Sequence, residues 1–268
     1  MSTPLLSDRE FGLLRDWVYA KAGISMSDAK KQLVMGRLQK RVLHHGLRSY
    51  ADYHQMISSG QAREESQMAL DLLTTNETYF FREPKHFDFL RARVLPERRA
   101  GASFRVWSAA CSSGEEPWSI AMSLAEKLND GSWEILASDL STRVLAQAAS
   151  GQYAMERAEH IPRALLTKYC LRGVGNQDGT FRIGPELRRW ASFRQVNLNE
   201  KLPDVGQFDL IFLRNVLIYF NAETKAEVVR RLCTHLRPGG YFFCGHSESL
   251  QGMELPLEAV QPAIYRRL

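Results

Sequence analysis

The chain has 268 residues, with 35 Lys and Arg against 30 Asp and Glu, so its formal net charge is only +5. A composition of 44% hydrophobic and 24% charged residues is close to the globular average and excludes a largely disordered or fibrous chain. Because the sequence has no apolar run of about 18 residues, no secretory signal and no CxxC pair, we expect a cytoplasmic protein without membrane insertion, disulfides or metal.

Residues 1–75 contain helical patterns and no strand-like run, so we expect a small all-α domain there. Ser7 and Glu10 form the pattern of a capping box, and Gly23 is placed to end the helix that follows. Further helices are predicted from Ser27 or Asp28 to about residue 45, over residues 50–58 and over residues 64–73.

Residues 76–268 show apolar strands alternating with helices, which is typical of a doubly wound, Rossmann-like α/β sheet. Strands are predicted over 104–109, 133–138, 208–213, 241–245 and 263–266, and helices over 116–128, 141–150 and 223–236. Residues 237–240 are interpreted as a stop and turn. Turn signals from about 171 to 193, including the pair Asp178 and Gly179, predict a small antiparallel β-subdomain inserted in this domain.

Polar residues follow three of the predicted strands, at the edge where doubly wound sheets bind ligands. The loop ACSSGEEP at 110–117 carries Glu115 and Glu116 instead of a glycine-rich phosphate cradle, which favours a ligand with a cation. Acids at a helix N-terminus are equally explained by the helix dipole. Asp139 stands where a ribose-binding acid belongs, although it could equally cap the next helix.

Arg214 and Asn215 follow the apolar strand at 208–213, and a buried arginine is costly unless it has a partner. Together, these residues indicate a nucleoside ligand that carries an amino group and a carboxylate but no phosphates. S-adenosylmethionine has those groups. The residues alone therefore predict a domain similar to the class I methyltransferases that depend on S-adenosylmethionine.

Several longer motifs make the chain similar to the CheR family of chemoreceptor methyltransferases. They occur in the family's order along nearly the whole chain: TTNETYFFRE at 74–83, WSAACSSGEEPWSI at 107–120, ASD at 137–139, RNVLIYF at 214–220 and GHSE at 245–248. The resemblance implies methyl esterification of glutamates on the cytoplasmic helical bundle of bacterial chemoreceptors, with S-adenosylhomocysteine as the second product. It also implies a monomer.

The resemblance assigns expected roles to individual residues. Arg82 would lie by the methionine carboxylate and the catalytic centre, and Tyr219 would lie beside the reacting methyl group. Glu116 would hold the amino group, and Asp139 would bind the ribose. Other cofactor contacts would come from Asn76, Thr78, Asn197, Leu198, Arg214 and Asn215. In some family members the β-subdomain docks a C-terminal tethering peptide of the receptor by strand addition.

A basic helix is predicted within residues 29–51, which contain no acid. At about 100° per residue, Arg37, Lys40 and Arg41 share one face, and Leu38 and Val42 lie opposite. A solvated basic face is one interpretation, and nucleic acid is another, although the face lacks aromatic residues for stacking. The resemblance favours contact of Arg37, Lys40 and Arg41 with acidic receptor helices, and no nucleic acid is expected.

Two other functions stay open from the sequence. One is a class I methyltransferase that acts on RNA or a small molecule, with the basic helix binding the RNA. The other is a regulatory module that binds the cofactor without turnover. His246 is interpreted as a structural residue of the GHSE turn rather than as a general base.

Overall fold

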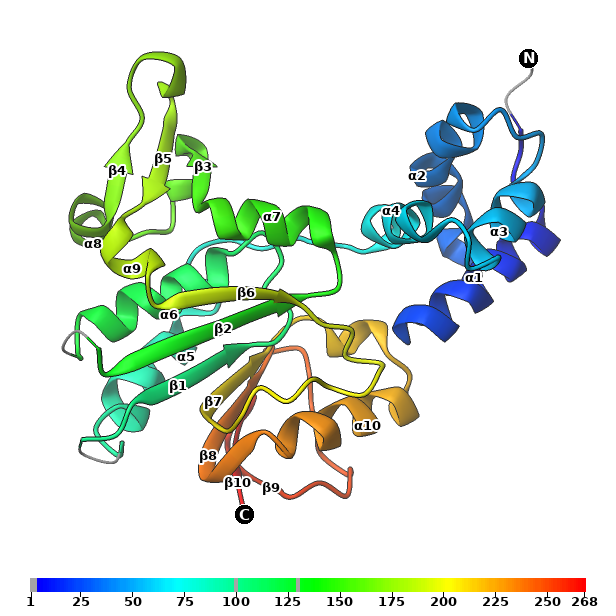
Figure 1. The fold of residues 1–268 in the computed structure, drawn as a ribbon. Coiled ribbons are helices and arrows are strands. Elements are labelled where there is room, and N and C mark those ends of the chain that lie inside the picture. Colours follow the sequence, from blue (N-terminus) through cyan, green and yellow to red (C-terminus); the bar gives the residue numbers. More distant parts are fainter. Residues whose placement is uncertain (1–3, 99–100, 129–130) are drawn as a thin grey trace.

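The computed structural model describes residues 4–98, 101–128 and 131–268. Residues 1–3, which contribute to the expected absence of a signal sequence, lie outside the described part. The helical domain comprises four helices, α1 (Asp8–Ala22), α2 (Lys31–His44), α3 (Tyr50–Ser58) and α4 (Arg63–Leu73), as predicted (Figure 1). Within the described residues, no helix is long and apolar enough to cross a bilayer.

The first helix begins and ends where the sequence predicts. The Ser7 hydroxyl accepts from the Glu10 amide, and the Glu10 carboxylate accepts from the Ser7 amide at 2.9 Å. The second carboxylate oxygen of Glu10 accepts from the amide of Ala51 at 3.0 Å, which ties α1 to the start of α3. Apolar residues from all four helices then form one core, which includes Phe11, Leu14, Val34, Leu38, Tyr53 and Leu70.

The central sheet has seven strands in the order β6-β2-β1-β7-β8-β10-β9. Its first five strands are parallel: β6 (Ala191–Gln195), β2 (Trp133–Asp139), β1 (Phe104–Ser108), β7 (Phe208–Leu213) and β8 (Leu236–Cys244). Strand β10 (Ile264–Arg267) pairs antiparallel with β8 and with β9 (Leu257–Gln261). This mostly parallel sheet confirms the predicted doubly wound class.

Helices cover both faces of the sheet, because side chains of successive strand residues point to opposite faces. On β7, Leu210 and Phe212 join the core that contains α6 (Glu115–Ala125) and α5 (Pro84–Phe89). Ile211 and Leu213 join the core that contains α10 (Ala222–Cys233). Figure 1 shows α6 and α10 on opposite sides of the sheet.

The predicted antiparallel insertion is present, but its predicted bounds are wrong. A three-stranded sheet with the order β3-β5-β4 contains β3 (Gln152–Ala154), β4 (Cys170–Arg172) and β5 (Thr180–Ile183), with α8 (Arg163–Tyr169) between β3 and β4. It therefore starts well before residue 171. Residues 191–193 belong to β6, because Ala191 pairs with Ile135 of β2 in the central sheet. The β4–β5 connection also includes a short helix at Gly175–Gln177 rather than a two-residue turn.

The turn predicted at residues 237–240 is also wrong, because β8 continues through these residues. Phe208 pairs with Leu236, and Leu210 pairs with Tyr241, so extra residues of β8 bulge out between these two pairs. The sequence further missed α5, the π-helical turn Leu90–Val94, α9 (Pro185–Arg188) and β9. The last predicted helix ends earlier, at Cys233.

The helical domain docks on the carboxyl edge of the sheet at two places. In the first, the Asp71 carboxylate accepts from the amide of Thr142 at 3.1 Å and from its hydroxyl at 2.9 Å, so α4 caps α7 (Thr142–Ser150). In the second, the amide of Ser25 donates to the carbonyl of Tyr219 at 2.8 Å, and Ile24 bridges to Phe220. These contacts place the α1–α2 connection directly over the sheet edge.

Candidate functional site

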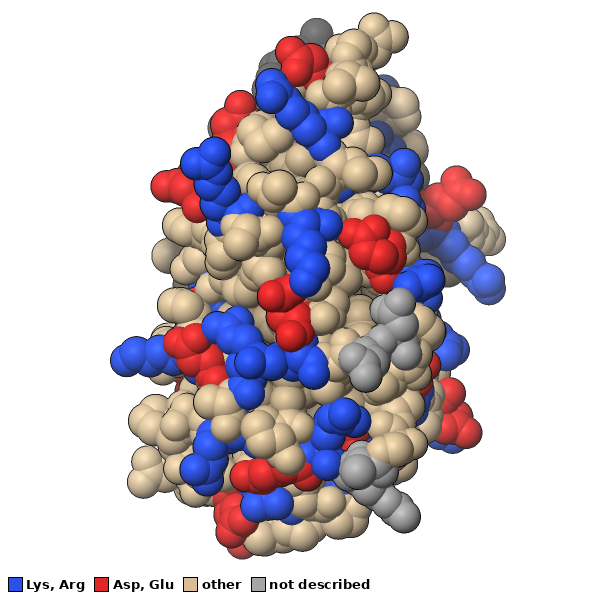
Figure 2. All heavy atoms as spheres, turned by 90° about the vertical axis from the view of Figure 1, so that its left-hand side faces the viewer, with Lys and Arg blue, Asp and Glu red and all other residues tan. Residues whose placement is uncertain are grey.

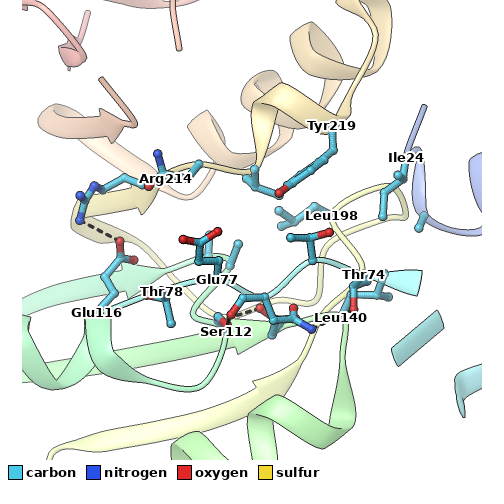
Figure 3. A pocket seen from close by; sticks show the side chains of 18 of the residues that line it. Ile24, Thr74, Glu77, Thr78, Ser112, Glu116, Leu140, Leu198, Arg214 and Tyr219 are labelled. Atoms are coloured by element: carbon cyan, nitrogen blue, oxygen red, sulfur yellow. Dashed lines mark hydrogen bonds and ion pairs between the residues drawn. The ribbon is translucent and has the colours of Figure 1, made fainter. Parts of the chain in front are cut away.

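A pocket of ≈ 1040 Å³ lies at the carboxyl ends of β1, β2 and β7, beneath the helical domain (Figure 3). All ten residues for which the sequence predicts a cofactor or catalytic role line this pocket: Asn76, Thr78, Arg82, Glu116, Asp139, Asn197, Leu198, Arg214, Asn215 and Tyr219. They come from distant parts of the chain and meet because parallel strands end at one edge. Their individual roles stay predictions.

Glu116 and Arg214 form an ion pair inside the pocket. Nη1 of Arg214 lies 3.1 Å from Oε2 of Glu116, and the Ser108 hydroxyl donates to Oε1 at 2.7 Å. Burial raises the pKa of Glu116, although the charge of Arg214 and the bond from Ser108 oppose that shift. An ammonium group at this carboxylate would favour its ionised form.

Asp139 sits at the end of β2 with its carboxylate held by backbone amides. One oxygen accepts from Ser112 at 2.8 Å, and the other accepts from Ser141 at 2.9 Å. Burial raises the pKa of Asp139, and these two amides oppose the shift. The carboxylate also lines the pocket, where it is an acceptor of the kind that ribose hydroxyls require.

The segment that follows α4 forms one wall of the pocket. The Ser112 hydroxyl donates to the carbonyl of Asn76 at 2.8 Å, which fixes this segment to the loop after β1. Arg82 donates to the carbonyl of Glu77 at 3.0 Å, and its guanidinium lies 5.7 Å from the centroid of the Tyr79 ring. Its guanidinium therefore lies at the pocket without a carboxylate partner among the described residues.

The opposite wall comes from the short helix Leu217–Tyr219 and from the segment after β6. Tyr219 points into the pocket (Figure 3), and its hydroxyl has no hydrogen-bond partner in the described part of the chain. Leu198 supplies a buried apolar contact. The side-chain Nδ2 of Asn197 donates to the carbonyl of Lys21 at 2.6 Å, so this residue also joins the pocket to the helical domain.

Sequence reasoning missed the contribution of the helical domain to the pocket. Ala22 and Ile24 line it, as do Ser112 and Leu140 from the loops after β1 and β2. No motif marks Ala22 or Ile24, because their place depends on contacts between segments about 200 residues apart. Ser112 could have been found from the sequence, because the small residues of the loop after β1 allow a ligand to approach the backbone.

The basic helix α2 differs from the predicted row of free cations. Arg41 forms an ion pair with Glu65, and its Nε donates to Glu65 at 2.9 Å. Arg37 donates to the carbonyls of Leu73 and Thr74 at 2.9 and 3.0 Å. Both arginines are therefore held by α4 and by Thr74 after it, which pack beside the face whose partner the sequence left open between solvent, nucleic acid and the receptor. Lys40 is exposed, as predicted.

Glu65 gives the helical domain a testable acid sensitivity. Burial would raise its pKa, but hydrogen bonds from Arg41, Tyr53 and His45 outweigh burial and lower the pKa from 4.5 to about 2. The ionised form is favoured by folding, so its stabilisation is complete above pH 4.5 and is lost as the pH falls toward 2.

We therefore expect Glu65→Gln to lower the free energy of unfolding by about 3 kcal/mol at pH 7. The difference from wild type should shrink steadily between pH 4.5 and about 2. Urea unfolding at several pH values measures both quantities. A difference that stays constant over this range would contradict the ionised, hydrogen-bonded state of Glu65.

A second cavity adjoins the pocket and shares Thr74 and Asn76 with it. It is open to solvent over a space of ≈ 1170 Å³, and its lining includes three arginines, one each from α2, α7 and the segment after β3: Arg37, Arg143 and Arg157. Among its lining residues there is no acid. We refer to this cavity as the basic groove.

The residues of the pocket fit a nucleoside that carries an amino acid. Glu116 offers a carboxylate to an ammonium group, Asp139 offers one to ribose hydroxyls, and Arg82 has a guanidinium without a carboxylate partner among the described residues. Backbone amides and carbonyls lie along the loop between them. No cluster of phosphate-binding amides is needed for such a ligand.

Comparisons with known proteins agree with this fit. The family described as "CheR methyltransferase, all-alpha domain" matches residues 9–74, and "CheR methyltransferase, SAM binding domain" matches residues 76–265. The chemotaxis protein methyltransferase of Escherichia coli (strain K12) is 41% identical over 252 residues, which cover 93% of this chain and 87% of that protein. Chemotaxis protein methyltransferase 2 of Pseudomonas aeruginosa is 39% identical over 259 residues, which cover 96% and 92%. The chain therefore belongs to the CheR methyltransferase family and is an S-adenosylmethionine-dependent methyltransferase of chemotaxis.

Proposed function

We propose that this enzyme methyl-esterifies glutamate side chains on the cytoplasmic helical bundle of chemoreceptors, in the cytoplasm. The observation that carries the proposal is a guanidinium and a phenol at one pocket: among the described residues, Arg82 has no carboxylate partner, the Tyr219 hydroxyl has no hydrogen-bond partner, and no histidine lines the pocket. Such a pair suits an acceptor that is already an anion. The names of the relatives place the reaction in chemotaxis but do not give the acceptor group.

A glutamate acceptor explains why the pocket needs no base. Its carboxylate is ionised at pH 7, so no proton has to be removed before attack. S-adenosylmethionine supplies a methyl group on a positively charged sulfonium. The new C–O bond forms as the C–S bond breaks, so the negative charge of the acceptor and the positive charge of the donor cancel. Excluding water from both charges favours that step.

In this proposal the residues of the pocket bind and align the two reactants. Glu116 holds the amino group, Asp139 holds the ribose and Arg82 attracts the methionine carboxylate and steers the acceptor. Tyr219 orients the acceptor beside the methyl group. The remaining contacts come from the pocket residues with predicted cofactor roles: Asn76, Thr78, Asn197, Leu198, Arg214 and Asn215.

We propose that the basic groove is the binding site of the receptor helix. The basic groove shares Thr74 and Asn76 with the cofactor pocket. Of its three arginines, Arg157 pairs with the buried Glu115 and Arg37 donates to two carbonyls, so Arg143 is the one without a carboxylate partner among the described residues. Methylated segments must present glutamates, so a helix that carries them is acidic and complements this groove. Lys40 lies one turn from Arg37 on α2 and extends the positive charge.

We expect the double substitution Lys40→Glu with Arg143→Glu to weaken receptor methylation about tenfold or more, through a higher KM for the receptor. Both side chains are exposed, so folding and S-adenosylmethionine affinity should stay within about twofold of wild type. Steady-state kinetics with a receptor fragment and calorimetry with the cofactor measure the two effects.

Lys127→Glu is the matched control, because this exposed lysine follows α6 at the end remote from the pocket. It reverses one charge, so it is compared with each of the single substitutions Lys40→Glu and Arg143→Glu, and it should leave the receptor KM unchanged. If Lys127→Glu raised the KM as much as these single substitutions, the net charge and not the basic groove would set receptor affinity.

Methylation of RNA or a small molecule is the second candidate function. Figure 2 shows the side of the molecule that lies away from the helical domain, and there Lys and Arg are intermingled with Asp and Glu. Methyl transfer from labelled S-adenosylmethionine to receptor fragments, with RNA as a parallel substrate, tests the choice. Carboxyl esters hydrolyse in base, so the proposal predicts base-labile label on the receptor, and base-stable label on RNA would contradict it.

A further inference from the structure

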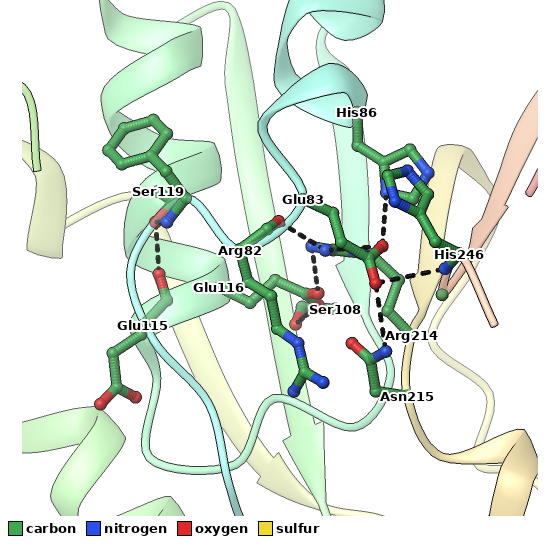
Figure 4. A network of polar contacts seen from close by, with 12 residues as sticks. Arg82, Glu83, His86, Ser108, Glu115, Glu116, Ser119, Arg214, Asn215 and His246 are labelled. Atoms are coloured by element: carbon green, nitrogen blue, oxygen red, sulfur yellow. Dashed lines mark hydrogen bonds and ion pairs between the residues drawn. The ribbon is translucent and has the colours of Figure 1, made fainter. Parts of the chain in front are cut away.

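Glu83 has no role so far, although its carboxylate lies at the centre of a polar network beside the pocket (Figure 4). Its Oε1 accepts from Nδ2 of Asn215 and from the amide of His246, both at 3.2 Å. Its Oε2 lies 3.0 Å from Nη2 of Arg214 and 3.3 Å from Nδ1 of His86. Neither contact of Oε2 is a hydrogen bond, so Glu83 is held by two hydrogen bonds at Oε1 and by the charge of Arg214 at Oε2.

Arg214 connects Glu83 to the cofactor pocket. Its side chain is only 2% exposed, and it lies between Glu83 and Glu116. Its Nη2 also donates to the carbonyl of Arg82. The position of Arg214 therefore determines the position of the Glu116 carboxylate. It also determines the position of the Arg82 backbone.

The backbone shows that the position of Glu83 is maintained against strain. Glu83 has φ 59° and directly precedes Pro84, and Asn215 has φ 58°. A left-handed conformation is strained for a glutamate, whereas asparagine adopts it more readily. The hydrogen bond between the side chains of Glu83 and Asn215 links these two left-handed positions across the network.

Charges in the network explain how Glu83 would act at a distance. Burial would raise the pKa of Glu83, but the charge of Arg214 and bonds from His246 and Asn215 outweigh it and lower the pKa. Burial and Arg214 lower the pKa of His86 to about 3, so His86 is neutral. The single positive charge of Arg214 thus interacts with two carboxylates, those of Glu83 and Glu116.

We propose that Glu83 is a positioning residue of the cofactor site, which holds Arg214 so that Glu116 and Arg82 face the methionine end of S-adenosylmethionine. Without the charge of Glu83, Arg214 would pair with Glu116 alone and draw its carboxylate away from the amino group. This inference rests on the proposed contacts of Glu116 and Arg82 with the cofactor. It does not depend on which acceptor is methylated.

A metal site is the competing interpretation of the same cluster. Ligand atoms of Glu83, His86 and His246 lie within 4.8 Å of one another. A divalent cation would, however, share Oε2 with Arg214 only 3.0 Å away, and Oε1 already accepts two hydrogen bonds. Oε2 and both ring nitrogens of His86 make no hydrogen bond among the described residues, but the guanidinium of Arg214 would repel a cation at Oε2. This repulsion favours the positioning role.

Isosteric substitutions in a double-mutant cycle test the proposal. We expect Glu83→Gln to raise the Kd for S-adenosylmethionine about tenfold or more, measured by calorimetry on the full chain. In a Glu116→Gln background the same substitution should raise Kd by less than about threefold, because both changes act through one network. Arg214→Lys keeps the charge but loses the fork geometry, and it should weaken binding like Glu83→Gln.

Several results would overturn the proposal. One is an unchanged Kd in Glu83→Gln or Arg214→Lys, even with a lowered melting temperature, since that is a purely structural effect. Another is full additivity of the two Gln substitutions. A third is micromolar Zn²⁺ binding by wild type that His246→Ala removes, which would assign the cluster to a metal. Glu116→Gln without any effect on Kd would instead contradict the proposed cofactor contact itself.

Discussion

Replacing Arg82 with Ala is expected to lower kcat for receptor methylation by about 10²–10³-fold, the range for removing one charged group that is aligned with the reacting atoms. Arg82 lies at the pocket with its guanidinium near Glu77 and Tyr79 and with no carboxylate partner among the described residues. Its charge is therefore available to the reactants. The affinity for S-adenosylmethionine should also fall, because the methionine carboxylate would lose its cation.

Arg91→Ala is a suitable control for this substitution. Arg91 lies in the π-helical turn that follows α5, outside the pocket lining, and pairs with the exposed Asp88 at 2.6 Å. We expect its kcat and cofactor affinity to match wild type. Steady-state rates with a receptor fragment measure both variants, and full activity of Arg82→Ala would overturn the proposed site.

Gly23→Ala is expected to separate the helical domain from the sheet edge and to weaken S-adenosylmethionine binding by about tenfold or more. Gly23 ends α1 with φ +71°, and a Cβ there would lie 2.8 Å from Oδ1 of Asn199 and 2.8 Å from Cγ2 of Thr224. Both neighbours lie beyond the helical domain. Because Ala22 and Ile24 line the pocket on either side of Gly23, a shift here opens the pocket.

Gly46→Ala separates the effect of the domain contact from the effect of backbone strain. Gly46 follows α2 with φ +64°, so the substitution carries a similar strain, but no atom lies within 4 Å of its Cβ position. We expect it to lower the free energy of unfolding by about 1 kcal/mol and to leave the cofactor Kd unchanged. Equal Kd values for the two alanine variants would contradict the role of the domain contact.

The pocket could be predicted from the sequence because its signals are local and a general rule joins them. Glu116, Asp139 and Arg214 each follow a strand with a clear apolar pattern, and parallel strands end at one edge. The capping box at Ser7 and the glycine at residue 23 likewise fix the ends of α1 through neighbouring residues. Such features need no knowledge of distant contacts.

Features that depend on distant contacts could not be predicted. The pairing of Arg41 with Glu65 requires α4 to lie beside α2, which a helical wheel of one helix does not contain. Ile24 lines the pocket only because its backbone forms an antiparallel β-bridge with Phe220, almost 200 residues later in the chain. The strand β8 overrides the turn signals at residues 237–240 because β7 pairs with it on both sides of the bulge.

The most direct test of the proposed activity is to locate the transferred methyl group on a receptor. The purified protein, a receptor cytoplasmic fragment and labelled S-adenosylmethionine would be incubated, and the labelled peptides would be sequenced by mass spectrometry before and after treatment with base. Our account predicts label on glutamate side chains, released by base and absent with Arg82→Ala. Base-stable label on another residue type would contradict it, as would transfer that persists in Arg82→Ala.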